Sequence, residues 1–372
     1  MLETVVLKNF KSIKNHAFNF KNLTVFSGLN GMGKSSLMQS LLLLRQSFEK
    51  NMLPGKALAL VGDYVKIGNG ADLLYVDSED DKIEYEVYWS DSLLKLTIKC
   101  NRGSNVQAIT EKTDDESCYK ESLFTSCFQY LSAERISPNS SYAVSDYDVS
   151  DLNSIGITGQ FTAHFIAEKG LKPIAIQALC HPKSGTDKTL LGNINAWMSE
   201  ITPGTRVVTK VMPEINQASL HYQFSTANGF TKEFRPENTG FGLTYVLPVV
   251  TAVLNAKKGD LLLIENPESH LHPAGQSAIG RLIALAAHHG VQIIVETHSD
   301  HFLNGVRISI RKNEASSKDV ALYYLSRDKD SAEHNVNIET ILIDSDGKID
   351  HWPKGFFDEW DNSLDELLRA KD

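Results

Sequence analysis

The chain has 372 residues, of which 42% are hydrophobic and 22% charged, a balance typical of a globular protein with a substantial core. Its net charge of −9 argues against a surface that is basic all over, although binding of DNA in a local groove stays open. Because no apolar run reaches about 18 residues, no segment is expected to cross a membrane. The amino terminus lacks a secretion-signal pattern, and four cysteines without a C-x-x-C spacing favour a reduced, cytoplasmic protein.

The first elements predicted along the chain are strands. Residues 2–26 alternate apolar and polar side chains, which predicts a hairpin and then a third strand. A glycine-rich run from Gly28 to Ser35 follows, and leucines at helical spacing then predict a helix that ends near Phe48. Strands at Lys82–Trp89 and Leu93–Lys99 are expected within an antiparallel sheet.

The character of the chain changes at about residue 136. From Ile136 to Arg235 the segments are mixed and polar, with a helix expected near Asn193–Ile201 and a hairpin that turns at Asn228-Gly229. No heptad pattern persists in this region, so the long coiled-coil arms of chromosome-organising ATPases are not expected.

Helices and strands then alternate regularly. Helices are predicted at Leu243–Leu254 and Ala274–His288, and buried strands at Leu261–Glu265 and Val291–Val295. This order predicts a parallel sheet with helices on both faces, and therefore an α/β fold.

The run Gly28-Leu29-Asn30-Gly31-Met32-Gly33-Lys34-Ser35 has the form G-x-x-x-x-G-K-S between a strand and a helix. Glycines let the backbone N–H groups surround a polyphosphate at the positive end of a helix. Lys34 would meet the outer phosphates, and the Ser35 hydroxyl would bind Mg²⁺. The alternative is a glycine-rich turn without a ligand, but the flanking strand and helix favour a nucleoside triphosphate site.

Two later segments carry polar groups directly after buried strands. Glu265 ends the strand Leu261–Glu265 and is followed by Asn266-Pro267-Glu268-Ser269-His270-Leu271-His272-Pro273. After the next strand the sequence reads Glu296-Thr297-His298-Ser299-Asp300. A carboxylate at the end of such a strand is where a magnesium-binding acid would face a phosphate loop.

With these segments the chain resembles the ABC-type ATPases of the RecF, SMC and overcoming-lysogenization-defect (OLD) group. The residues from Lys8 to Ile13 match the first hairpin of that group, and Asn238-Thr239-Gly240-Phe241-Gly242 stands where its signature motif belongs. The carboxyl-terminal run Trp352-Pro353-Lys354-Gly355-Phe356-Phe357-Asp358-Glu359 resembles a tail found on small ATPases of this group. Residues 136–235 carry little of the resemblance.

The resemblance implies a fold and a division of the chain. The fold is an ABC-type ATPase head, with a mixed sheet flanked by helices, an antiparallel β subdomain and an inserted mixed or helical lobe. Residues 1–135 form the amino-terminal half of the head with the phosphate loop, and residues 136–235 form the inserted lobe. Residues 236–372 form the carboxyl-terminal half, with the signature, the magnesium strand, the switch histidine and the short tail.

The resemblance also implies ATP and Mg²⁺ as ligands and assigns residues to them. The nucleotide-binding residues are Lys11, Asn30, Gly31, Gly33, Lys34, Ser35, Ser36, Gln129, Thr239, Gly240 and Gly242. Magnesium is assigned to Ser35 and Glu265, and the catalytic set is Glu265, Glu268 and His298. Thr239 and Gly240 would contact the γ-phosphate held by a second subunit, so ATP is expected to join a head-to-tail homodimer. Gln129 is expected to link the core to the inserted lobe, and for Arg135 a functional and a structural role stay open.

One position departs from the general ABC pattern. The magnesium acid is normally followed at once by a glutamate that activates water, but here Asn266 occupies that place. Because an amide cannot accept a proton at neutral pH, a general base is missing at this position. Three outcomes stay open: Glu268 reaches in as the base, a partner supplies a base, or hydrolysis is slow and the protein is a long-lived ATP clamp. We expect slow hydrolysis with Glu268 as the weak or indirect base.

The expected function is an ATP-hydrolysing dimeric switch in DNA-directed defence or repair, together with a separate effector such as a nuclease. The alternatives are a non-hydrolysing ATP-dependent scaffold and, less favoured, a transporter subunit. An intrinsic nuclease would need the Asp344-Ser345-Asp346-Gly347 run to belong to a TOPRIM domain, for which too little chain remains. The run is better interpreted as a hairpin turn. Metal binding by His270 and His272 is also not favoured.

Overall fold

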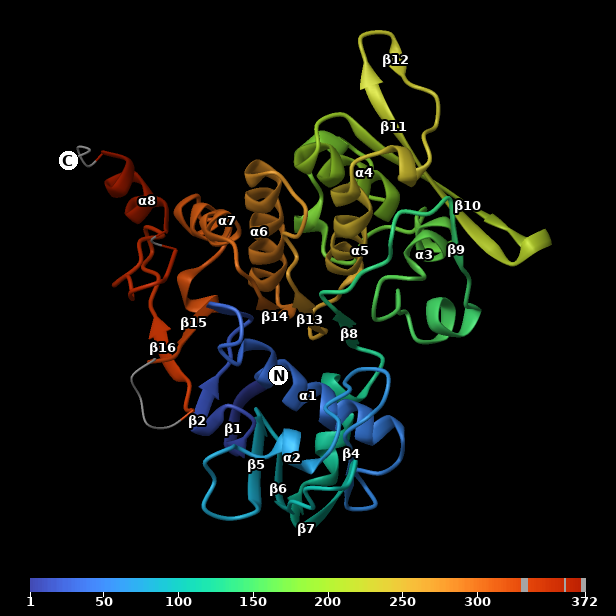
Figure 1. The fold of residues 1–372 in the computed structure, drawn as a ribbon. Coiled ribbons are helices and arrows are strands. Elements are labelled where there is room, and N and C mark those ends of the chain that lie inside the picture. Colours follow the sequence, from blue (N-terminus) through green and yellow to red (C-terminus); the bar gives the residue numbers. More distant parts are fainter. Residues whose placement is uncertain (329–333, 358, 369–372) are drawn as a thin grey trace.

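The computed structural model describes residues 1–328, 334–357 and 359–368, and its centre is a six-stranded sheet (Figure 1). Five of the strands are parallel neighbours, and β16 pairs antiparallel with β15 at one edge. The predicted parallel sheet is therefore confirmed. In spatial order the strands are β16 (Asn337–Ile341), β15 (Val320–Ser326), β3 (Leu23–Gly28), β14 (Gln292–Glu296), β13 (Leu261–Glu265) and β8 (Phe128–Leu131).

Both faces of this sheet are buried, which explains the continuous apolar runs of its strands. Leu262 and Ile264 of β13 pack into the core beneath the helices, whereas Leu261 and Leu263 pack into a second core on the other side. Figure 1 shows α5 (Phe241–Asn255), α6 (Pro273–His288) and α7 (Asp300–Arg311) on one side of the sheet and α1 (Lys34–Glu49) on the other. The predicted helices and strands agree with these bounds within a few residues.

A six-stranded antiparallel sheet packs with α1 around the second core. Its first two strands form the predicted amino-terminal hairpin, and β5 and β6 have the predicted bounds. The short helix α2 (Gly70–Leu73) precedes β5 along the chain. In spatial order the strands are β2 (Ile13–Asn19), β1 (Leu2–Phe10), β5 (Lys82–Trp89), β6 (Leu93–Lys99), β7 (Val106–Asp114) and β4 (Ala57–Ala59).

Residues 136–235 contribute a third sheet, parts of which project from the body of the molecule (Figure 1). It contains β9 (Ser141–Ala143), β10 (Thr205–Met212), β11 (Gln217–Thr226) and β12 (Gly229–Phe230), together with the helices α3 (Thr162–Lys169) and α4 (Leu190–Ile201). The helix predicted near residue 193 begins at Leu190, because the Thr189 hydroxyl caps it by accepting the Gly192 N–H at 3.1 Å. Apolar residues of α3 and α4 belong to the same core as α5 and α6.

The carboxyl-terminal residues pack against β15 and α7. The Asp344 carboxylate accepts the backbone N–H groups of Asp346 and Lys348, and Gly347 has a φ of 74°, so the predicted hairpin turn is confirmed. Phe356 of the predicted tail is fully buried against Tyr324. Asp358 of the tail lies outside the described residues, and α8 (Glu359–Leu368) follows. No helix within the described ranges is long and apolar enough to cross a membrane.

Two glycines allow α6 and α7 to lie in direct backbone contact. A Cβ atom on Gly280 would lie 2.2 Å from the Phe302 carbonyl oxygen, and one on Gly305 would lie 2.1 Å from the Ser277 carbonyl oxygen. This close packing fixes the start of α7, which directly follows the segment that carries His298.

We predict that Gly280→Ala lowers the free energy of unfolding by ~1–3 kcal/mol, because the added methyl group forces two packed helices apart. Urea unfolding would measure the change. The control is Gly103→Ala, whose new Cβ would meet only the Asn101 Oδ1 atom at 3.9 Å. Equal unfolding free energies for the two variants would contradict this account of the helix contact.

Candidate nucleotide-binding site

The phosphate loop connects β3 to α1, as its sequence predicts. Gly31 and Gly33 have φ values of 77° and 82°, in the left-handed region that glycine adopts without strain. A Cβ atom on Gly33 would lie 2.3 Å from the Ser12 Oγ atom, so this glycine also makes room for the β1–β2 turn. The backbone conformation of the loop therefore requires glycines at the two positions.

Lys34 begins α1, and its ammonium group lies inside the loop. Its Nζ atom donates hydrogen bonds to the carbonyl oxygens of Gly28 and Leu29 at 2.8 and 2.7 Å. Burial lowers the pKa of Lys34, and the carboxylate of Glu296 opposes that shift. These contacts hold the cation where the loop would surround a polyphosphate.

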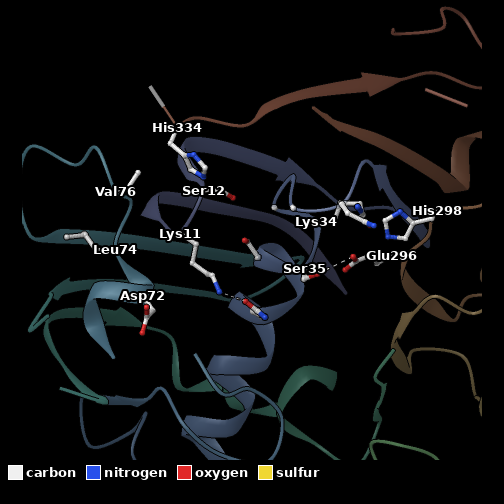
Figure 2. Close-up of a pocket in the computed structure, with 15 residues that line it drawn as sticks. Lys11, Ser12, Lys34, Ser35, Asp72, Leu74, Val76, Glu296, His298 and His334 are labelled. Atoms are coloured by element: carbon white, nitrogen blue, oxygen red, sulfur yellow. Dashed lines mark hydrogen bonds between the residues drawn. The ribbon is translucent and has the colours of Figure 1, made fainter. Parts of the chain in front are cut away.

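A cavity of about 500 Å³ opens above the loop, a volume suited to a small ligand (Figure 2). Eight of the predicted site residues line it: Lys11, Asn30, Gly31, Gly33, Lys34, Ser35, Ser36 and His298. The Lys11 Nζ atom donates a hydrogen bond to the Gln39 Oε1 atom on α1 at 2.7 Å, which ties the first hairpin to the phosphate helix. His334, which sequence analysis missed, also lines the cavity, from the connection between β15 and β16.

Glu296 at the end of β14 is a further cavity residue that sequence analysis missed. The Ser35 hydroxyl donates a hydrogen bond to its Oε1 atom at 3.1 Å (Figure 2), and its buried Oε2 atom has no partner among the described residues. Burial, followed by the nearby Glu265, raises the pKa of Glu296 to about 7. The sequence did contain a signal for Glu296, because an apolar strand ends in this carboxylate. The same pattern led to the assignment of Glu265 on β13.

Glu265 does not line this cavity, because its side chain is directed to β8. Its Oε1 atom accepts the Tyr130 hydroxyl at 3.0 Å, and its Oε2 atom accepts the Ala133 N–H at 2.9 Å. The buried Arg135 donates hydrogen bonds to the carbonyl oxygens of Glu265 and Asn266. The described hydrogen bonds of the Arg135 guanidinium therefore have a structural role. Their acceptors are backbone carbonyl oxygens and not carboxylates.

Glu268 is likewise not among the described residues that line the cavity. Its Oε1 atom accepts the backbone N–H of His298 at 3.0 Å, while its buried Oε2 atom has no described partner. Burial raises the pKa of Glu268. In this conformation Glu268 holds the segment that carries His298 and does not line the cavity. The side-chain oxygen of Asn266 is likewise buried without a described partner.

His298 points into the cavity beside Lys34 (Figure 2). Burial lowers the pKa of its imidazole, and the Lys34 ammonium lowers it further. A neutral ring next to the phosphate loop can donate one hydrogen bond and accept another. The structure therefore brings His298 together with Lys34, Ser35 and Glu296.

The signature residues lie away from this cavity at the start of α5. The Thr239 hydroxyl donates to the Pro236 carbonyl oxygen at 2.9 Å. Gly240 is exposed, and a Cβ atom on it would meet nothing within 4 Å in the described chain. Gly242 has no such room, because a Cβ atom there would lie 2.4 Å from the His270 carbonyl oxygen. The segment is thus firmly placed on its own chain and open on its outer side.

Gln129 does not reach the phosphate cavity either. Its side-chain amide donates to the Gly156 carbonyl oxygen at 3.0 Å and accepts the Ile155 N–H at 3.1 Å. The described contacts of Gln129 therefore connect β8 to residues 154–156, which lie within the expected lobe of residues 136–235.

The histidines after β13 have structural partners. The His270 ring packs edge-on against Phe241 and Tyr245, and the His272 Nδ1 atom caps α6 by accepting the Ala274 N–H. In the turn at residues 344–347, the Asp346 side chain pairs with Arg311. These contacts give no support to a metal site at the two histidines or to a nuclease centre at the turn.

The donor atoms near Ser35 suit Mg²⁺, which prefers oxygen ligands from a hydroxyl, one or two carboxylates and phosphates. The orphaned Oε2 atom of Glu296 is an acceptor that a divalent cation would satisfy. Ser35 and Glu296 would hold the ion, which would offset the charge of the phosphates.

Three family models match parts of the chain. A family model described as AAA ATPase domain matches residues 1–146, and one described as AAA domain, putative AbiEii toxin, Type IV TA system, matches residues 131–304. A third, described as Protein of unknown function (DUF3696), matches residues 316–367. No curated protein matches the chain in sequence.

Two solved structures have a similar fold. A crystal structure of the Smc head bound to the C-winged helix domain of ScpA has 15% identity and a TM-score of 0.52, and the match covers 92% of this chain and 98% of that chain. The Smc head with an extended coiled coil from Pyrococcus furiosus, bound to the C-terminal domain of ScpA, has 13% identity, a TM-score of 0.52 and 99% coverage of both chains. These structures establish that the chain has the mixed α/β fold of SMC ATPase heads. The two ATPase-domain matches support an ATPase that binds nucleotide.

Proposed function

We propose that this protein binds and hydrolyses ATP as a head-to-tail homodimeric switch, in DNA-directed defence or repair, together with a separate effector such as a nuclease. The observation that carries the proposal is the cavity above the phosphate loop, where Lys34, Ser35, Glu296 and His298 converge. Positive charge and backbone N–H groups suit a polyphosphate, and the oxygen donors suit its magnesium ion.

The homodimer follows from the position of the signature. Thr239 and Gly240 are exposed or half-buried at the amino-terminal end of a 15-residue helix, and they do not line the phosphate cavity of their own chain. The amino-terminal end of a helix attracts anions, so this end is suited to a γ-phosphate presented by another copy. Two copies related by a two-fold axis would complete two such sites.

Slow hydrolysis is expected from the residues at and near position 266, where a general base is missing. Asn266 cannot accept a proton, and Glu268 accepts the His298 N–H instead of facing the cavity. Glu268 would then act indirectly, by positioning the switch histidine. The same observation favours one alternative function, a non-hydrolysing ATP-dependent scaffold, which measured turnover would distinguish.

The partners and the cellular role rest on analogy. The similar Smc heads are bound to ScpA, which supports a partner protein for this head, and the description of a putative toxin of a type IV TA system supports a role in defence. We place the inserted lobe, residues 136–235, as the part that would transmit the dimer state, because α4 packs directly on α5 behind the signature. A cytoplasmic location is part of the proposal.

We predict that Lys34→Ala weakens ATP binding roughly 10- to 100-fold, because it removes a charged hydrogen-bond donor from the phosphate loop. Isothermal titration calorimetry of the full chain with ATP would measure the affinity. The exposed Lys50, just beyond α1, provides the control variant Lys50→Ala, which should bind as the wild type does. Equal ATP affinity in Lys34→Ala and the wild type would contradict the assignment of the loop.

We predict that Thr239→Arg keeps ATP affinity but prevents ATP-driven dimerisation, because it places bulk and charge against the partner's nucleotide. Light scattering with and without ATP would report the mass, and a phosphate-release assay would report hydrolysis. Thr110→Arg, on the exposed face of β7, is the matched control. Normal dimerisation and hydrolysis in Thr239→Arg would show that the signature is assigned wrongly.

We predict that Asn266→Glu raises ATP turnover, because a general base typically contributes ~10²–10⁴-fold. Glu268 is tested with two variants. Glu268→Gln retains an acceptor for the His298 N–H and should keep most of the turnover, whereas Glu268→Ala removes the acceptor and should lower it.

Steady-state phosphate release measures all three variants. If Glu268 were itself the base, Glu268→Gln would lower ATP turnover as much as Glu268→Ala. A fast wild-type enzyme that is indifferent to all three substitutions would show that the catalytic residues lie elsewhere.

A further inference from the structure

We propose that a cavity between the inserted lobe and the carboxyl-terminal end of α5 binds the phosphate group of a small phosphorylated molecule. The cavity has a volume of about 320 Å³, at the lower end of the range for small-molecule sites. It shares no described lining residue with the cavity above the phosphate loop. The inference therefore does not depend on ATP binding at that loop.

Three lysines line this second cavity, although the protein as a whole has a net charge of −9. Lys169 ends α3, Lys172 follows in the connection to α4, and Lys257 lies just beyond α5. None of the described residues that line the cavity is an aspartate or a glutamate. The lining is therefore positively charged and suits an anion.

The ammonium group of Lys169 is held in place by uncharged partners. Its Nζ atom donates a hydrogen bond to the Asn153 Oδ1 atom at 2.8 Å and lies 4.8 Å from the centre of the Phe165 ring. Asn153 also lines the cavity, and its φ of 53° lies in a region that asparagine adopts more readily than most residues do. Because an ammonium group has three donors, donors of Lys169 remain for a ligand.

The charges of the three lysines act on one another. Burial lowers the pKa of Lys169, and the charges of Lys172 and Lys257 lower it further, whereas Glu168 opposes the shift. Bringing like charges together is unfavourable, and a bound anion would offset their repulsion. A phosphate group carries about two negative charges at neutral pH, and the compact charge of a lysine is well suited to bind it.

The residues around the cavity favour a small ligand over a nucleic acid. The Glu168 carboxylate accepts the hydroxyl of Ser150, a lining residue, at 3.1 Å. The Asp260 carboxylate accepts the backbone N–H of Lys257 at 2.8 Å. These two acidic groups limit the positive charge to the cavity, whereas a nucleic-acid backbone requires positive charge along several consecutive phosphates.

Apolar residues of the lining connect the cavity to the helix that carries the signature. Leu190 begins α4 and Leu254 lies in the last turn of α5, and both are buried. Their side chains would contact the organic part of a phosphate ester. Because Gly240 precedes the other end of α5, a ligand in this cavity would contact both the inserted lobe and the signature helix.

Isothermal titration calorimetry with inorganic pyrophosphate tests the site. The full chain with the Lys34→Ala substitution is used, so that the phosphate loop contributes little to the binding, and we expect saturable binding. Lys172→Ala and Lys257→Ala, each added to that chain, should weaken the binding roughly 10- to 100-fold, because each removes a charged hydrogen-bond donor. Both lysines are exposed, so the variants should fold, which thermal unfolding would check.

Three controls accompany these variants. Lys172→Arg, which retains the charge, should keep most of the affinity. Lys312→Ala, at an exposed position just beyond α7, should leave the affinity unchanged. Citrate, which carries a similar charge on carboxylates, should bind more weakly than pyrophosphate.

Several results would overturn the inference. They are an absence of pyrophosphate binding in the Lys34→Ala chain, an unchanged affinity in both lysine-to-alanine variants, and an equal affinity for citrate. A short DNA duplex that displaces pyrophosphate and depends more strongly on the same lysines would assign them to a nucleic acid instead. Each of these results leaves the proposed ATPase function intact, because ATP binding to the wild type tests that function independently.

Discussion

The whole candidate site depends on one constraint of parallel sheets: the carboxyl ends of β3, β14 and β13 meet at the same edge. The phosphate loop leaves from the first of these ends, the Glu296 to His298 segment from the second, and Glu265 from the third. Side chains that are far apart in sequence therefore converge without any long loop. The glycine contacts that bring α7 against α6 hold the second of these segments in place.

This convergence has an electrostatic consequence. Burial raises the pKa of Glu296, and the nearby carboxylates of Glu265 and Glu268 raise it further. Only some of the oxygen atoms of these three carboxylates have described partners. Buried carboxylates without partners are unfavourable for folding unless they serve a ligand. The unpaired oxygens thus support the proposal that this edge binds a magnesium ion together with a nucleoside triphosphate.

Sequence reasoning predicted the local parts of this arrangement well. The phosphate loop and the central strands have strong local patterns, so the element bounds and the cavity positions of Lys34 and Ser35 followed from sequence alone. It could not rank the carboxylates, because which of Glu265, Glu268 and Glu296 faces the cavity depends on strand order and on competing hydrogen bonds. For Gln129, the contacts with Ile155 and Gly156 agree with the expected link to the inserted lobe, but Gln129 does not line the nucleotide cavity.

The central claim is that one nucleotide joins the phosphate loop of one copy to the signature of another. Hydrogen–deuterium exchange with and without ATP and Mg²⁺, repeated over a range of protein concentrations, tests it most directly. We expect ATP to protect residues 28–36 at every concentration and residues 238–242 only where the dimer forms. Protection of the phosphate loop alone, even at high protein concentration, would contradict the account.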